Sequence, residues 1–173
     1  MSDSPGSSAD DLLLRLVAER DVMATLQRYA QCIDYGDVDG WVDCFTADGV
    51  FEILLRRPEG FEPWGLYEGA AALTGFARSH THAPDAWHKH VLWGSIVEVS
   101  DSGTGDEATV ASTFARVDHG ESGPYIRAFG RYTDHLVRSD DGRWRISRRR
   151  AEIESMAAGA LPHRVADGPE TTR

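Results

Sequence analysis

The sequence predicts an α+β fold in which helices cover one face of a curved antiparallel sheet. Two observations support this prediction. Apolar residues recur at helical spacing across residues 10–35, as they do in a long amphipathic helix. The chain from residue 88 onward reads instead as long strands separated by turns. A helical part followed by antiparallel strands is typical of the α+β class.

The first part of the chain contains one long helix and several shorter elements. Asp10 or Asp11 is expected to cap the start of the long helix. Its apolar side is formed by Leu12, Leu16, Val22, Met23, Leu26, Tyr29, Ala30 and Ile33. The elements expected to follow are a short helical piece (41–45), a strand (50–55), a loop (56–65), a short strand (66–69) and a helix (70–80).

Four long strands are predicted in the second part, at residues 88–100, 107–118, 124–138 and 143–153. Gly94 lies inside the first of them. A glycine within a strand suggests a bulge, and a bulge changes which side chains face the core. Alternation alone therefore does not decide which face of this strand meets the helices.

Length and charge limit the classes of function. A chain of 173 residues is expected to form one domain, which we place at residues 10–156. A disordered N-terminus (1–9) and a flexible C-terminal tail (157–173) are expected to flank it. The net charge of −10 disfavours nucleic acid or an acidic membrane surface as a partner.

The location of the protein is also constrained by the sequence. No run of apolar residues approaches the length of a membrane span, and the N-terminus lacks the regions of a signal peptide. These features predict a cytoplasmic protein. Cys32 and Cys44 match neither a redox motif nor a zinc pattern, so we expect both thiols to be reduced.

Asp34 is the first residue that suggests chemistry. It follows the apolar Ile33 and lies at the edge of the buried side of the long helix, just beyond Met23 and Ala30. Burying an ionised carboxylate is costly. Asp34 is therefore either a solvated residue at the helix boundary or a carboxylate placed toward a cavity between helix and sheet.

The second feature is the segment HTHAPDAWHKH, which holds four histidines. His88 and His90 are two residues apart, so in a strand both would project from the same face. Imidazole titrates close to neutral pH, which suits a general base. A metal site built from this pair with His80, His82 or Asp85 is the alternative, but no known ligand spacing is completed, and we predict no metal site.

Further residues are candidates for contacts with a substrate. Arg148 shares a strand face with Trp144 and Ile146, which favours it among three consecutive arginines as the one that points inward. An inward arginine would balance a buried carboxylate or bind an anionic substrate oxygen. Aromatic side chains that could line a pocket are Trp64, Trp87, Trp93 and Phe114. Ser112 and Thr113 are the polar residues of the neighbouring strand.

The order of these elements resembles a known family. The segments LQRYAQCIDYGDVDGWVDCFTADGVFEI, YEGAAALTGF, HVLWGSIVEV and GRYTDHLVRSDDGRWRISRR together resemble the SnoaL-like branch of the nuclear-transport-factor-2-like superfamily, over residues 12–155. The resemblance implies a cone-shaped α+β barrel, with a curved, mixed, mostly antiparallel sheet wrapped around the N-terminal helices and an internal pocket.

Within that branch the chain is similar to cofactor-free lyases: scytalone dehydratase, hexachlorocyclohexane dehydrochlorinase and the bile-acid dehydratase. Those enzymes pair an aspartate near the end of the first long helix with a histidine at the start of the third strand. Their pattern maps the catalytic roles onto Asp34, His90 and Tyr29, and a substrate arginine onto Arg148. The second catalytic histidine of scytalone dehydratase has no counterpart, which leaves Ser112 at that place.

The resemblance implies a cofactor-independent lyase that carries out a dehydratase-type elimination on a hydrophobic steroid-like, aromatic or polyketide-like molecule. His90, or His88 in its place, would be the base, and no metal or organic cofactor would be required. His88, Trp93, Ser112 and Phe114 would complete the substrate site together with Arg148. An isomerase, a polyketide cyclase and a non-catalytic small-molecule binder are the alternatives, and a homodimer or homotrimer is expected.

Overall fold

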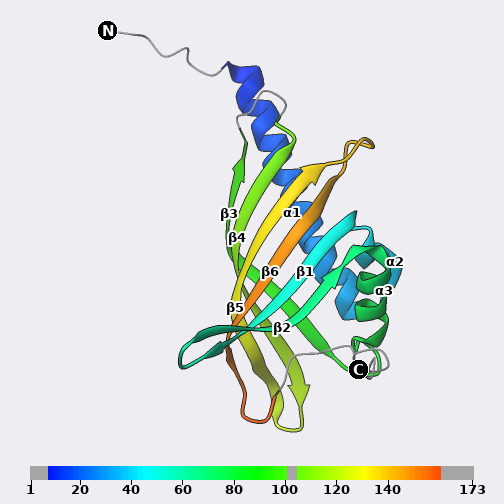
Figure 1. Cartoon of the computed structure of the whole chain (residues 1–173), viewed down its shortest axis with the longest axis vertical. Coiled ribbons are helices and arrows are strands. Elements are labelled where there is room, and N and C mark those ends of the chain that lie inside the picture. Colours follow the sequence, from blue (N-terminus) through cyan, green and yellow to red (C-terminus); the bar gives the residue numbers. More distant parts are fainter. Residues whose placement is uncertain (1–7, 101–104, 161–173) are drawn as a thin grey trace, which may run out of the picture.

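The computed structural model describes residues 8–100 and 105–160 of the chain. Its elements run in the order α1 (Ala9–Tyr35), α2 (Val38–Val42), β1 (Phe45–Arg57), β2 (Gly60–Glu68), α3 (Gly69–Ser79), β3 (His88–Val99), β4 (Glu107–Gly120), β5 (Gly123–Arg138) and β6 (Trp144–Met156) (Figure 1). A helical part followed by long strands is the order that the sequence predicts.

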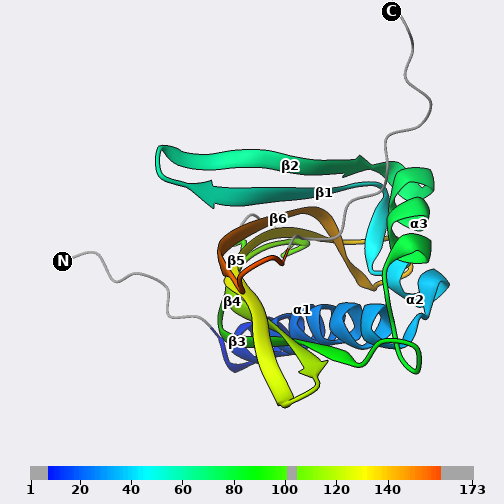
Figure 2. The ribbon, with the colours of Figure 1, turned by 90° about the horizontal axis from the view of Figure 1, so that it is seen from below.

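All strands described belong to one mixed sheet, in the order β2-β1-β6-β5-β4-β3. β1 runs parallel to β6, and the other neighbouring strands are antiparallel. Figure 2 shows the sheet curling around α1, with α2 and α3 at one end of the curl. The predicted α+β fold with a curved sheet around the N-terminal helices is confirmed, although the sheet is open and β2 and β3 form its two edges.

The long helix packs against the sheet with the side that its periodicity predicts. Val22, Leu26, Tyr29 and Ile33 are buried together in the hydrophobic core. The first turns are different, because Leu12 and its neighbours are exposed, Leu12 by 53%. These turns extend past the end of the sheet (Figure 1), so the expectation that the whole apolar side of the helix packs is wrong for them.

The helix α1 begins at Ala9, one residue before the predicted span, and the prediction of Asp10 or Asp11 as its N-cap is wrong. Ser8 is the N-cap: its hydroxyl accepts from the backbone N–H of Asp11, and the Asp11 carboxylate accepts from the N–H of Ser8. Such a capping box satisfies two backbone donors of the helix end. Residues 8 and 9 therefore belong to the structured start of α1, and the rest of the predicted disordered N-terminus lies outside the described residues.

The segment predicted as a loop (56–65) is largely part of a hairpin between β1 and β2. β1 begins at Phe45, earlier than predicted, and the short helix lies before it, at residues 38–42. Pro63 of β2 pairs with Leu54 of β1. Because β2 is an edge strand, it tolerates the missing N–H of a proline. The prolines and glycines that suggested a loop are thus accommodated at the sheet edge and in the turn.

The end of the chain departs from the predicted flexible tail (157–173) in its first residues. The N–H of Ala157 donates to the carbonyl of Arg127 at 2.8 Å, and that of Ala160 donates to the carbonyl of Ala157 at 3.0 Å. These bonds hold a turn against β5, and residues 161–173 lie outside the described residues. None of the helices in the described part of the chain has the length and apolar character that a membrane crossing requires.

Two neighbouring strands approach each other closely at Gly130 of β5. A Cβ added there would lie 1.9 Å from the carbonyl oxygen of Glu152 on β6. In contrast, a Cβ added at Gly75 of α3 meets no atom within 4 Å. The two glycines therefore form a matched pair for testing the sheet.

We expect Gly130→Ala to lower the free energy of unfolding by about 2 kcal/mol or more, because β5 and β6 must separate locally. Gly75→Ala is expected to raise it by about 0.5–1 kcal/mol through helix propensity. Urea unfolding of both variants measures the difference. Equal stabilities for the two variants would contradict the close strand approach.

Candidate active site

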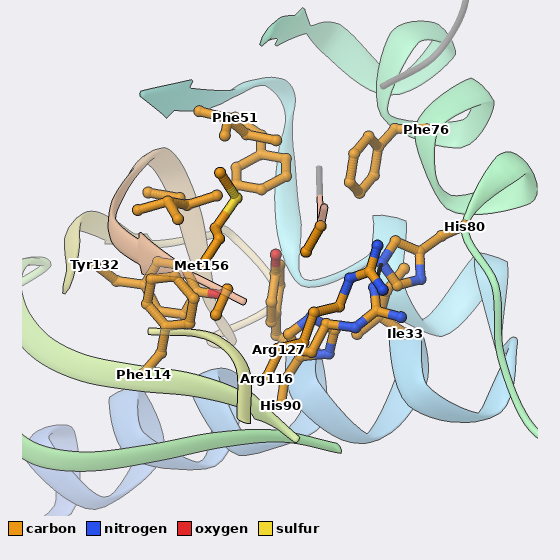
Figure 3. Close-up of a pocket in the computed structure, with 16 residues that line it drawn as sticks. Ile33, Phe51, Phe76, His80, His90, Phe114, Arg116, Arg127, Tyr132 and Met156 are labelled. Carbon is orange, nitrogen blue, oxygen red and sulfur yellow. Dashed lines mark hydrogen bonds between the residues drawn. The ribbon is translucent and has the colours of Figure 1, made fainter. Parts of the chain in front are cut away.

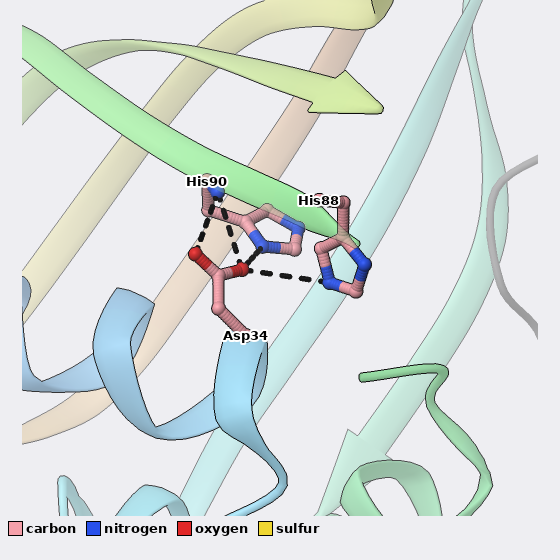
Figure 4. Close-up of side chains that lie close together, drawn as sticks. All are labelled: Asp34, His88 and His90. Carbon is pink, nitrogen blue, oxygen red and sulfur yellow. Dashed lines mark hydrogen bonds and ion pairs between the residues drawn. The ribbon is translucent and has the colours of Figure 1, made fainter. Parts of the chain in front are cut away.

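Asp34 lies near the end of α1 and points its carboxylate at the start of β3. The side chain is buried, with 3% of the residue exposed. Its Oδ1 lies 2.7 Å from Nδ1 of His90, and its two oxygens accept from the backbone N–H of His90 at 3.2 and 3.0 Å (Figure 4). A buried carboxylate is tolerated when such donors replace water. Asp34 is therefore not a solvated boundary residue.

This contact determines which ring nitrogen of His90 is left as a hydrogen-bond acceptor. With Asp34 ionised, Nδ1 of His90 carries the proton and donates to the carboxylate. Nε2 is then left with its lone pair, which is the state a general base needs. Asp34 and His90 thus lie in the hydrogen-bond contact that an aspartate–histidine dyad requires, while their catalytic role stays a prediction.

Two further histidines surround the dyad. Nε2 of His88 lies 3.5 Å from Oδ1 of Asp34, and neither ring nitrogen of His88 has a hydrogen-bond partner among the described residues. The His88 ring stands perpendicular to that of His90, with centroids 5.4 Å apart. His80 lies within 5.6 Å of His90, and its Nδ1 donates to the carbonyl of Thr81. Of the two histidines on β3, His90 makes the stronger contact with Asp34.

Asp34, His88 and His90 also form a set of potential metal ligands, because their ligand atoms lie within 4.8 Å of one another. Two histidines and a carboxylate are a known ligand combination. Here, however, Oδ1 of Asp34 and Nδ1 of His90 are only 2.7 Å apart, a hydrogen-bond distance. A metal ion would have to replace the proton between these atoms, so the geometry fits a dyad better than a metal centre.

The dyad borders a cavity between α1, α3 and the concave face of the sheet (Figure 3). The centre of a water molecule can occupy about 70 Å³ of this cavity. Its empty space is about 630 Å³ when the open solvent at its mouth is included. The residues that line it are Tyr29, Ile33, Phe51, Ile53, Phe76, His80, His90, Phe114, Arg116, Arg127, Ala128, Tyr132, Ala151, Ile153, Met156 and Ala160. Since the free space is small, a ligand of several rings requires flexible side chains near the opening to move.

Tyr29 is buried in an aromatic cluster beneath the cavity. Burial raises the pKa of its phenol above the ordinary value of 10.0, and the positive charge of Arg149 acts in the opposite direction. The Arg149 guanidinium lies 4.0 Å from the centre of the Tyr29 ring and 4.2 Å from that of Tyr132. The Tyr29 hydroxyl is therefore protonated at neutral pH and is available as a donor at the cavity wall.

The expectation that Arg148 points inward is wrong, and Arg149 takes that place. Arg148 is exposed and pairs with Glu52 at 3.1 Å, whereas Arg149 is fully buried and binds Asp134 through two contacts of 2.7 Å. The cause is a bulge in β6. Ile146 pairs with Leu136 and Arg148 pairs with the adjacent His135, so the intervening Ser147 is an extra residue that reverses the alternation.

The other predicted contact residues divide into two groups. Phe114 lines the cavity and stacks on Tyr132, with ring centroids 4.2 Å apart. Trp93 is 48% exposed and does not line the cavity. Ser112 is buried, but its hydroxyl bonds to that of Ser95 at 2.9 Å and it does not line the cavity either. The predicted bulge at Gly94 is present, with φ of 61° and a register shift between Trp93 and Ile96.

The sequence did not predict that three polar residues, His80, Arg116 and Arg127, line the cavity, although His80 was considered as a metal ligand. Arg116 binds Asp118 through Nε at 2.7 Å, and Arg127 lies 3.5 Å from the same carboxylate. A signal was present for Arg116, which shares a strand face with Asp118 two residues later. No local pattern marks Arg127, because its inward direction depends on a shift of register.

The buried histidines make stability depend on pH. Burial, with the charge of Arg116 next, lowers the pKa of His88 from 6.5 to about 4. Burial, with His90 next, lowers that of His80 from 6.5 to about 2. Below pH 6.5 the unfolded chain binds these protons and the folded chain does not. The stability that the two neutral histidines contribute is thus fully present above pH 6.5. The contribution of His88 is lost as the pH falls toward 4, and that of His80 as the pH falls toward 2.

We expect the free energy of unfolding to fall by about 1.4 kcal/mol per pH unit for each buried histidine over this window. His80→Asn removes one of the two contributions, while His119→Asn, on an exposed part of β4, leaves the slope unchanged. Urea unfolding at a series of pH values measures the slopes. A wild-type slope in His80→Asn would show that the folded protein accommodates the proton.

Comparisons with known proteins place this site in a family. A family model described as a SnoaL-like domain matches residues 14–150. No curated protein sequence matches the chain. A variant of Rv3472, a protein of unknown function from Mycobacterium tuberculosis, is 29% identical with a TM-score of 0.67, covering 88% of this chain and 86% of that one.

More distant structures share the fold. An NTF2-like protein with a cystatin-like fold from Novosphingobium aromaticivorans has a TM-score of 0.69 at 19% identity, covering 88% of this chain and 94% of that one. ActVI-ORFA from Streptomyces coelicolor has a TM-score of 0.60 at 21% identity, covering 76% and 93%. The extent of the family match and the agreement in fold lead to one conclusion: the chain belongs to the SnoaL-like domain family.

Proposed function

We propose that the protein is a cofactor-independent lyase that eliminates water from a hydrophobic, cyclic small molecule of steroid-like, aromatic or polyketide-like structure. The observation that supports this most directly is the 2.7 Å contact between Asp34 and His90 at the wall of a largely apolar cavity. A dyad in that position provides a base with a defined tautomer. The aromatic walls would bind the rings and exclude water from the reaction.

The first step is removal of a proton. Nε2 of His90 takes a proton from a carbon next to an activating carbonyl or aromatic group, and the electrons of the C–H bond are delocalised into that group, as in an enolate. Asp34 stabilises the imidazolium that results, because its carboxylate holds the Nδ1 proton. Since the dyad is shielded from solvent, this interaction is stronger than it would be in water.

The second step is loss of the hydroxyl group. The delocalised electrons form the new C=C bond to the neighbouring carbon as its C–O bond breaks with its electrons on oxygen, and the oxygen leaves as water after it receives a proton. Tyr29 and the His90 imidazolium are the two candidate donors on the cavity wall. Because burial raises the pKa of Tyr29, its phenol is protonated at neutral pH and holds the proton that the leaving oxygen would receive.

The same dyad would also serve an isomerase or a polyketide cyclase, in which the abstracted proton returns to another carbon or a new C–C bond forms. An epoxide hydrolase of this fold would need two carboxylates around an arginine. Arg116 instead has Asp118, His80 and Thr81 as its described partners. A binding domain without chemistry is the remaining alternative.

The proposal is tested with a β-hydroxy tetralone, a cyclic β-hydroxyketone that loses water to give a fluorescent naphthol. In deuterated water, mass spectrometry also detects exchange of the protons next to its carbonyl, whether or not elimination follows. We expect Asp34→Asn to slow both reactions by about 10²- to 10⁴-fold, because His90 loses its tautomer control. Binding of the tetralone should change little.

Asp140→Asn, in an exposed turn, is the matched control and should retain the wild-type rates. His90→Gln keeps a polar side chain at the same place and should be as inactive as Asp34→Asn. If the wild-type protein binds the tetralone but catalyses neither exchange nor elimination, the lyase proposal fails and a binding domain becomes the better interpretation.

We further propose that the protein self-associates through the outer face of its sheet. Val91, Trp93, Ile96 and Phe129 are 42–65% exposed and form what we call the outer patch. Val91 pairs with Ala115, which pairs with Phe129, so the patch runs across three adjacent strands. A contiguous exposed apolar surface of this kind is typical of an interface.

We expect the wild-type protein to be a dimer or trimer and Trp93→Glu to be a monomer, since a charge at the centre of the outer patch would be buried without a partner. Leu66→Glu, on the exposed edge strand β2, is the control and should not change the mass. Light scattering coupled to gel filtration measures all three. A monomeric wild-type protein would contradict the proposal.

A further inference from the structure

We propose that Asp34, His88 and His90 bind a divalent cation such as Zn²⁺, and that the ion inactivates the proposed base. The ion would be an inhibitor and not a cofactor. The dyad and the metal site are two alternative states of the same side chains, since either a proton or an ion lies between Oδ1 of Asp34 and Nδ1 of His90. Binding of the ion goes beyond the proposed function, whereas the inactivation rests on it.

His88 is the member of this group that the dyad leaves unused. Its side chain is 1% exposed, and neither ring nitrogen has a hydrogen-bond partner within the described residues. A neutral imidazole has one donor and one acceptor, and buried polar atoms are normally paired. Figure 4 shows a ring nitrogen of His88 facing the carboxylate of Asp34. A buried nitrogen in this position can act as a third metal ligand.

The spacing of the three ligand atoms is close to that of a tetrahedral site. Zn²⁺ binds imidazole nitrogen at about 2.0–2.1 Å and carboxylate oxygen at about 2.0–2.2 Å, so neighbouring ligand atoms lie about 3.3–3.5 Å apart. Nε2 of His88 is already 3.5 Å from Oδ1 of Asp34. Nδ1 of His90 is 2.7 Å from that oxygen, so this pair must open by about 0.6–0.8 Å. Small rotations of the side chains therefore convert the dyad into a three-ligand site.

The carboxylate of Asp34 keeps a second contact when it binds an ion. Its Oδ2 accepts from the backbone N–H of His90 at 3.0 Å, and this bond does not involve the imidazole ring. Oδ1 can therefore turn from the proton of the ring to the ion while Oδ2 stays bound. The negative charge of the buried carboxylate also offsets part of the charge of the ion, without which a buried cation is unfavourable.

An ion on Nδ1 changes the state of the other nitrogen of His90. Nδ1 cannot hold a proton and an ion through the same lone pair, so the proton that it carries in the dyad moves to Nε2. An N–H bond breaks at Nδ1, another forms at Nε2, and the freed lone pair binds the ion. The ring stays neutral and no proton is released. Nε2 is then a donor, and the proposed base has no lone pair for a substrate proton.

The ligand set favours some cations over others. Imidazole binds Zn²⁺, Co²⁺, Ni²⁺ and Cu²⁺ well, whereas Mg²⁺ and Ca²⁺ prefer oxygen ligands. Of the three residues, only His90 lines the cavity, so the ion would lie behind its ring and leave the cavity free. The fourth position of a zinc ion with three protein ligands is commonly taken by water. We therefore expect inhibition that does not compete with an apolar ligand.

The first experiment measures the binding of Zn²⁺, Co²⁺ and Mg²⁺ to chelator-treated protein without substrate. Isothermal titration calorimetry gives the stoichiometry, and the visible absorption of Co²⁺ is intense in four-coordinate sites and weak in six-coordinate ones. We expect one Zn²⁺ or Co²⁺ per chain, a four-coordinate spectrum and no comparable binding of Mg²⁺.

His88→Gln and Asp34→Asn should each weaken the binding of Zn²⁺ by more than about 100-fold, because loss of an outer-shell partner alone typically costs about 10- to 100-fold. His135→Asn, which changes an exposed histidine of β5, is the matched control and should bind like the wild type. Circular dichroism verifies that the variants are folded.

The second experiment needs no variant. Nuclear magnetic resonance of wild-type protein with ¹⁵N-labelled histidine reports which ring nitrogen carries a proton. One histidine should change from Nδ1–H to Nε2–H when Zn²⁺ is added. Saturating Zn²⁺ should also slow proton exchange of the tetralone by about 10²- to 10⁴-fold through kcat, with KM unchanged, and a chelator should restore the rate.

The contrary outcomes are distinct. No saturable binding, a six-coordinate Co²⁺ spectrum, or wild-type affinity in both His88→Gln and Asp34→Asn would overturn the metal site. Binding of Zn²⁺ without the change of tautomer, or with full exchange activity, would overturn the inactivation of the base. If the lyase proposal itself fails, the chelator-treated protein catalyses no exchange, while the stoichiometry, the spectrum and the effects of the variants stay as expected.

Discussion

The contact between Asp34 and His90 is the interaction on which the arrangement of the cavity depends. It joins the end of the first helix to the first residues of an edge strand, far away in the sequence. The backbone carbonyl of Asp34 also accepts from the N–H of Ala83, so the segment before β3 is tied to the same turn of the helix. If the carboxylate lost these donors, it would be buried without solvation. The contact that stabilises the closure of helix on sheet is therefore also the contact that orients the imidazole ring of His90.

Beneath the cavity, side chains of the hydrophobic core also form the cavity floor. Arg149 lies between the rings of Tyr29 and Tyr132, and Tyr132 stacks on Phe114. The guanidinium is held in place by the two hydrogen bonds that it donates to Asp134, and both members of this pair are fully buried. Breaking such a pair leaves an uncompensated buried charge, so its geometry is strongly maintained. The cavity floor is rigid because it belongs to the core.

The sequence predicted the parts of the site that depend on unbroken periodicity. Helical spacing placed Asp34 at the edge of the buried side, and the spacing of His88 and His90 placed both on one face of a strand. The resemblance to the family selected the pair Asp34 and His90. Each of these positions follows from residues that lie within one regular element, so no knowledge of the partner strand was needed.

The incorrect predictions concern residues next to bulges, where the alternation of side chains between the two faces of a strand is interrupted. Arg148 and Arg149 exchange places because Ser147 is an extra residue relative to β5, and Arg127 turns inward for the same reason relative to β4. Whether a strand holds one residue more than its neighbour is a property of the pair, which neither segment shows alone. The loop predicted over residues 56–65 failed for a related reason, since its prolines and glycines are compatible with an edge strand whose pairing is not visible in the sequence.

The bulge at Arg127 has a consequence for how such a pocket changes over evolutionary time. Inserting or removing a single codon at this bulge in β5 would turn this charge into or out of the cavity, while the order of the strands stays as it is. A point substitution alters one side chain, but a one-residue insertion exchanges the two faces of the strand beyond it. Ligand preference in this fold can therefore diverge through length changes within strands, at sites where an alignment would show only a gap.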